Sequence, residues 1–204
     1  MRLPHLTPDQ LDPEQGALRD AIVTGPRTTG PQLFELVDAQ GRLNGPFGVM
    51  LHSPAVGGAL SELGTALRYR SVLSARLREI AILAVAAHWS SDFEQYAHEP
   101  IGRAAGLTDA QVEALAAGLE VELDDPVEAT GLRIVRALLT RADLADEEYA
   151  EGRETLGEQA LVELTALVGY YATLALQLRV FRVGVPAPRP ESAGVGRVPG
   201  SWDR

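Results

Sequence analysis

Hydrophobic positions recur with helical spacing along most of the chain, and no segment alternates strictly between apolar and polar residues as a half-buried strand does. We therefore predict an all-α fold, a single-domain helical bundle. The stretch 28–44 has a mixed pattern and leaves one further helix open. The predicted helices cover residues 13–24, 54–69, 75–89, 91–105, 108–117, 125–142, 146–157 and 158–183.

The helix predicted at 75–89 differs from the others because residues 80–87 are apolar on every face. A helix without a polar face is buried on all sides, so we expect this one at the centre of the domain. The helix at 158–183 is also long and largely apolar. Residues 77–80 (LREI) and 161–164 (LVEL) lie near the starts of the two helices and have similar sequences. Two related helical halves would explain this similarity, and so would chance.

Length and composition are those of one globular domain: 204 residues, of which 46% are hydrophobic. We predict an all-helical domain over residues 1–184. Residues 185–204 are rich in proline and glycine and are unable to build a core. We expect this tail to be either disordered or an arm laid along a neighbouring subunit.

The charge and the ends of the chain limit its partners. A net charge of -10 argues against nucleic acid and against an anionic membrane surface. The first residues carry no apolar stretch of the kind found in signal peptides, and the strongly apolar run 80–87 is too short to span a bilayer. We therefore predict a cytoplasmic protein with no membrane partner.

Missing residue types exclude several chemistries. The chain has no cysteine, which excludes disulfides, thiolate metal sites and cysteine peroxidase activity. All 18 basic residues are arginine, so no lysine can form a Schiff base with a substrate or with pyridoxal phosphate. A multi-histidine metal site would need most of the four histidines. We predict neither a metal nor a cofactor.

Residues 78–107 hold the side chains best placed for chemistry. Glu79 lies at the start of the apolar helix, so we expect its carboxylate in the interior, where burial raises the pKa and makes it a candidate proton carrier. Glu94 and His98 are four residues apart and share one helix face. A carboxylate beside an imidazole fixes the tautomer and raises the basicity of the ring.

The spacing of Glu79, Ser91, Glu94 and His98 resembles the signature of the carboxymuconolactone decarboxylase and alkyl hydroperoxidase D superfamily. The similarity extends from about residue 44 to residue 185. The peroxidase branch has cysteine at the positions of Ser91 and Glu94, so this chain is more similar to the cysteine-less decarboxylase branch. The resemblance implies an all-helical fold and a homo-oligomer, either a trimer or a hexamer.

The resemblance also implies a function: cofactor-independent decarboxylation or isomerisation of a small carboxylated or lactone-containing molecule. In this interpretation His98 delivers a proton, Glu94 orients the imidazole of His98, and Glu79 is a second proton carrier or a polar partner. An arginine would hold the substrate carboxylate. The arginines nearest in sequence are Arg70, Arg76 and Arg78, and the candidates for substrate contacts are Ser91, Tyr96, Arg76 and His52.

Each of these residues also has a purely structural interpretation. Ser91 and Glu94 have the spacing of a capping box, which would keep Glu94 outside any pocket. His98 could bind the backbone carbonyl of residue 96, which Pro100 deprives of its helical donor. Glu79 could pair with Arg76 one turn earlier. The protein would then be a catalytically inactive relative of the peroxidase branch that binds a small molecule or serves in an assembly.

Overall fold

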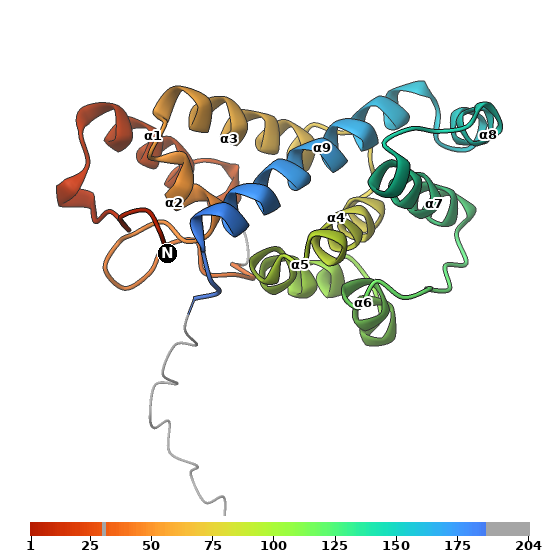
Figure 1. Ribbon diagram of the computed structural model, residues 1–204, viewed down its shortest axis with the longest axis horizontal. Coiled ribbons are helices and arrows are strands. Elements are labelled where there is room, and N and C mark those ends of the chain that lie inside the picture. Colours follow the sequence, from red (N-terminus) through yellow and green to blue (C-terminus); the bar gives the residue numbers. More distant parts are fainter. Residues whose placement is uncertain (30–31, 187–204) are drawn as a thin grey trace, which may run out of the picture.

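The computed structural model describes residues 1–29 and 32–186, and over these residues the fold is all-α, as predicted (Figure 1). Within them, the β interaction found is an isolated antiparallel bridge between Val37 and Leu43. The α-helices are α1 Pro13–Val23, α2 Pro46–Met50, α3 Pro54–Tyr69, α4 Ala75–Trp89, α5 Asp92–Ala104, α6 Asp109–Ala116, α7 Pro126–Arg141, α8 Asp146–Leu156 and α9 Glu158–Phe181. Two short 3-10 helices, Pro8–Gln10 and Pro26–Thr28, lie near the N-terminus.

The helix ends agree with the sequence prediction to within one or two residues, because local side chains cap them. The Ser74 hydroxyl accepts a hydrogen bond from the Leu77 N–H at the start of α4. The Asp125 carboxylate accepts one from the Val127 N–H at the start of α7. The sequence did not reveal α2, since five residues are too few to show a helical period. The described part of the mixed stretch contains no α-helix.

Helix α4 lies at the centre, as predicted, and packs against α5, α6, α7 and α9 (Figure 1). Its side chains Ile80, Ile82 and Leu83 are completely inaccessible to solvent. A helix buried on all faces can bring a polar side chain into the interior only where another buried polar group meets it. Glu79 on this helix is such a side chain.

Helix α9 runs diagonally across the bundle beside α4 and α7 (Figure 1). Of the helices described, it alone is long and apolar enough to cross a membrane by length and composition. Half of its most apolar stretch is buried inside the bundle. The apolar composition of α9 is therefore explained by its place as a core helix of the bundle. The predicted tail 185–204 lies outside the described residues from position 187 onwards.

Candidate functional site

Glu79 of α4 and His98 of α5 form a buried hydrogen bond. Glu79 Oε2 lies 2.6 Å from His98 Nδ1, and the two residues are 0% and 6% exposed. An ionised carboxylate at this distance holds the imidazole proton on Nδ1 and fixes the ring orientation. The other ring nitrogen, Nε2, is therefore the one that faces the next group.

That next group is Glu94, one turn earlier on α5, whose Oε2 lies 3.5 Å from His98 Nε2. Glu94 is buried, and its Oε1 has no hydrogen-bond partner. The imidazole thus lies between two carboxylates, each on a different ring nitrogen, so the three side chains do not surround a common point. In the part of the chain that the structure describes, no cluster of three or more histidine, cysteine or acidic side chains is arranged for a metal.

The two carboxyl groups have opposite electrostatic environments. Burial raises the pKa of Glu79, but the neighbouring His98, followed by Arg68 and Arg78, outweighs it and holds this pKa below its usual value. Glu79 Oε1 lies 3.7 Å from Arg78 Nε and 3.9 Å from Arg68 Nη1. The predicted rise in the pKa of Glu79 is therefore wrong, because the sequence did not show which cations surround it.

Glu94 has the raised pKa that was expected of Glu79. Burial, the dominant influence, raises the pKa of Glu94 to about 7, and the negative charge of Glu79 adds to the rise. The charges of His98 and Arg68 oppose it without cancelling it. A carboxyl group with this pKa exists in both protonation states near neutral pH and can give or take a proton.

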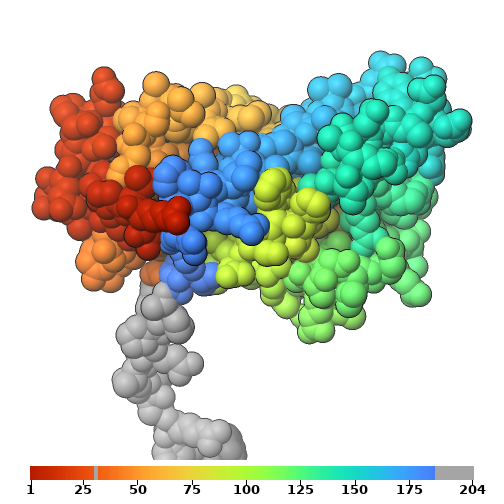
Figure 2. All heavy atoms as spheres, in the orientation of Figure 1, coloured from red at the N-terminus to blue at the C-terminus, as the bar shows by residue number. Residues whose placement is uncertain are grey.

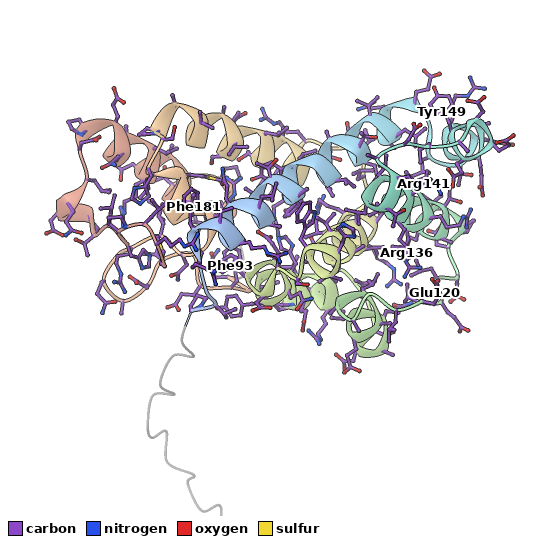
Figure 3. All side chains as sticks on the ribbon, viewed as in Figure 1. Phe93, Glu120, Arg136, Arg141, Tyr149 and Phe181 are labelled. Carbon is purple, nitrogen blue, oxygen red and sulfur yellow. The ribbon has the colours of Figure 1, made fainter. Side chains whose placement is uncertain are left out.

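A cavity of about 280 Å³ adjoins this cluster, and Glu94 and His98 form part of its wall. Glu79 lies behind His98 and does not line the cavity. Residues from the segment 27–47 and from α3, α4, α5 and α9 line it, among them Phe93 of α5, which is labelled in Figure 3. The lining is basic and aromatic: Arg27, Arg68 and Arg78 together with Phe34, Phe47, Tyr69, Phe93, Tyr170 and Tyr171.

Of the three arginines nearest in sequence, Arg78 is the one that lines the cavity, and its buried Nε has no hydrogen-bond partner. Sequence reasoning missed Arg68 and Arg27. Arg27 donates to Thr65 Oγ1 at 2.8 Å and lies over the ring of Phe47, with 5.4 Å from its guanidinium carbon to the ring centroid. No sequence signal could have found either residue, because both reach the cavity from segments distant in sequence from Glu94.

Two adjacent tyrosines of α9 complete the wall. The ring of Tyr171 meets His98 edge-on at 5.3 Å between centroids. Burial raises the pKa of Tyr170 to about 12 and that of Tyr171 well above its usual value, so both phenols stay protonated at neutral pH. Gly64 lets Tyr170 approach α3, because a Cβ at this glycine would overlap the tyrosine hydroxyl.

Four residues predicted to contact a substrate lie elsewhere. Arg76 binds Glu128, Gln111 and the carbonyl of Gly106. His52 Nε2 lies 2.9 Å from the carbonyl oxygen of residue 4, and the Tyr96 hydroxyl accepts from the backbone N–H of residue 35 at 3.4 Å. Ser91 lines a different hollow. The structure does not bring any of the four to the cavity that Glu94 and His98 line.

The structural interpretations of the three central residues are not observed. Ser91 makes no side-chain cap hydrogen bond, and Glu94 points its carboxylate at His98 instead of back to the helix start. Both ring nitrogens of His98 face carboxylates and not a carbonyl. Arg76 pairs with Glu128, at 2.8 Å, and not with Glu79.

Residues 54–137 match the model of the Carboxymuconolactone decarboxylase family, a segment that contains Glu79, Glu94 and His98. No curated protein matches the sequence. A peroxidase-related protein from Ralstonia eutropha JMP134, described as an alkylhydroperoxidase AhpD core, superimposes with a TM-score of 0.72 at 14% identity, covering 91% of this chain and 92% of that one.

Two further structures share the fold. A peroxidase-related protein from Silicibacter sp. TM1040 has a TM-score of 0.70 at 13% identity, with 92% of this chain and 91% of that chain covered. The debrominase Bmp8, known in complex with 2,3,4-tribromopyrrole, has a TM-score of 0.64 at 14% identity, with 86% and 87% covered. At these identities the likeness shows a common fold.

Proposed function

From the match of residues 54–137 to the model of the Carboxymuconolactone decarboxylase family, we propose that this chain is a cofactor-independent acid–base enzyme that decarboxylates or isomerises a small carboxylated or lactone-containing molecule. One observation carries the proposal. Glu94 has a pKa of about 7 and an unpartnered oxygen, lies at the wall of a basic cavity, and contacts a histidine that a second carboxylate holds in place.

The cavity lining supports an anionic substrate. Arg27 and Arg78 line it without a carboxylate in hydrogen-bonding contact, so their guanidinium groups can bind a substrate carboxylate. The aromatic side chains in the lining favour a compact, partly apolar molecule. In a cavity of about 280 Å³, this lining suits a small ring that carries one acidic group.

For decarboxylation, the bond between the substrate carbon and its carboxylate breaks, carbon dioxide leaves, and the electron pair stays on the carbon. The protonated Glu94 then gives its proton to that carbon and becomes ionised, and solvent restores the proton. The overall reaction consumes one proton per carbon dioxide released. For isomerisation, the ionised Glu94 takes a proton from one carbon and returns it to another.

His98 and Glu79 support this proton transfer, which reverses the roles expected for the two glutamates. Glu79 stays ionised and keeps a proton on His98 Nδ1, so Nε2 is left to exchange a proton with Glu94. Glu94 becomes the acid that meets the substrate, and Glu79 becomes a positioning residue.

The proposal is tested with a panel of small lactone acids and cyclic carboxylic acids in deuterated water, followed by NMR for deuterium incorporation and by carbon dioxide release. The wild type should convert at least one class of compound. Glu94→Gln keeps the size and burial of the side chain but removes the titrating proton, so turnover should fall at least about a hundredfold while binding persists. Unchanged turnover in this variant would contradict the proposal.

A binding protein without catalytic activity is the alternative in this family. It would bind members of the same panel without deuterium exchange or carbon dioxide release, and Glu94→Gln would change affinity alone.

Assembly into a trimer or hexamer is also part of the proposal, because the resemblance implies it. Size-exclusion chromatography with light scattering tests it, and a monomer at micromolar concentration would contradict it.

A further inference from the structure

A second hollow, of about 480 Å³, lies where the first residues of α5 meet the last turn of α9. Figure 3 marks these two ends with Phe93 and Phe181. The N-terminal residues lie against the same end of α9 (Figure 2), where the Arg2 N–H donates to the Phe181 carbonyl at 2.6 Å. Phe93 also lines the cavity of the proposed active site, so the two spaces share this residue.

Three arginines line this hollow: Arg2, Arg179 and Arg182. None of them has an ion pair among the described residues, whereas most arginines elsewhere in that part of the chain do. In a protein of net charge -10, three cations without ion pairs in one place concentrate positive potential, and the only hydrogen bond found for their guanidinium groups in the described residues runs from Arg2 Nη1 to the Val180 carbonyl oxygen, at 3.0 Å.

Ser91 provides an independent observation. It is 6% exposed, its hydroxyl oxygen is buried without a hydrogen-bond partner, and the residue lines the hollow. A buried hydroxyl without a partner is costly, and a ligand that accepts its proton would remove that cost. Because Ser91 does not cap α5, the first N–H groups of this helix also lack a side-chain acceptor.

We propose that this hollow binds a phosphate group, held by Arg179, Arg182 and Arg2, by the Ser91 hydroxyl and by the first N–H groups of α5. Guanidinium groups bind phosphate through paired hydrogen bonds, and the positive end of a helix dipole favours an anion. These groups together offer more donors than the two oxygens of a carboxylate can accept. Asp92 also lines the hollow and opposes an anion, but the arginines outnumber it.

The experiment uses the full chain and isothermal titration calorimetry with two probes, inorganic phosphate and phenyl phosphate. Wild-type protein should bind at least one of them saturably. Arg179→Gln removes one guanidinium from the hollow and should weaken binding about tenfold. Arg153→Gln is the matched control, because Arg153 is an exposed arginine of α8 without an ion pair and its loss changes the net charge equally. This variant should bind like the wild type.

Ser91→Ala keeps every charge and should weaken phosphate binding severalfold, which separates a built site from general attraction to arginines. Tighter binding of phenyl phosphate supports a phosphorylated small molecule, and equal binding supports free phosphate. The proposal is overturned if neither probe saturates, if Arg153→Gln weakens binding as much as Arg179→Gln, or if Ser91→Ala binds as tightly as the wild type.

Discussion

Two arginine–carboxylate networks involve side chains of α4, and they differ in how completely their polar atoms are paired. In the first, Arg76 bonds to Glu128, to Gln111 and to a backbone carbonyl. In the second, Arg78 Nε, Glu79 Oε1 and Glu94 Oε1 are buried without hydrogen bonds.

The incomplete pairing coincides with the cavity: both Arg78 and Glu94 line it, while Arg76 and Glu128 do not. A fully paired network leaves no group free for a ligand, so its contribution is to stability. A network with unpaired groups beside a cavity is less stabilising, but its free donors and acceptors can form hydrogen bonds with a substrate. Measurements on the two networks should therefore separate stability from activity.

The largest expected effect is on turnover, in the unpaired network. His98→Ala removes the group between the two carboxylates, and we expect turnover to fall between about a hundredfold and ten-thousandfold. Steady-state kinetics on the compound identified from the panel gives the value, with circular dichroism as the control for folding. Full activity in a folded His98→Ala variant would remove this residue from the mechanism.

The next effect concerns stability and pH. Because folding raises the pKa of Glu94 from 4.5 to about 7, the folded state binds more protons than the unfolded state between these values, and stability falls as the pH rises through this range. The Gln side chain of Glu94→Gln does not ionise, so the variant does not lose stability in this way. Its free energy of unfolding should therefore rise relative to that of the wild type by up to about 3 kcal/mol between about pH 4.5 and pH 8. Urea unfolding of both proteins at the two pH values measures it. A constant difference would show that Glu94 ionises normally.

In the paired network, the expected effect is on stability alone. Glu128→Gln removes the charge that Arg76 needs, and should lower the free energy of unfolding by about 2 kcal/mol. The kcat for the compound identified from the panel should stay within about twofold of wild type, since neither residue lines the cavity. A large fall in kcat with unchanged stability would reverse the assignment of the two networks.

The smallest effect tests the cavity wall. Inside a helix, at a position with free space for the methyl group, replacing glycine with alanine raises the free energy of unfolding by up to about 1 kcal/mol. We expect this gain for Gly169→Ala in α9, because a Cβ at this glycine meets nothing within 4 Å. Gly64→Ala should show no such gain, because the new methyl group overlaps Tyr170. Displacing that ring should raise KM severalfold with a smaller change in kcat. Equal stabilisation by both substitutions would show that Tyr170 does not pack against Gly64.

Much of the fold could be predicted because helix signals are local. Proline at the first turn and the caps Ser74 and Asp125 act within a few residues, so the sequence places the helix ends closely. The central position of α4 followed from its composition alone. The short helix α2 and the isolated bridge between Val37 and Leu43 could not be predicted, since each is too short to show a helical or an alternating period.

For the candidate site, the sequence determined which residues share a helix face: Glu94 and His98 are neighbours because they are four apart on α5. Only the tertiary structure decided how the pKa values of the two glutamates differ. His98, followed by Arg68 from α3, outweighs the burial of Glu79 and keeps its pKa low, so Glu79 stays ionised. Glu94 is buried with less compensation, so its pKa is raised to about 7. A pKa depends on the charges and solvent around a group in space, and spacing along the chain does not contain that information.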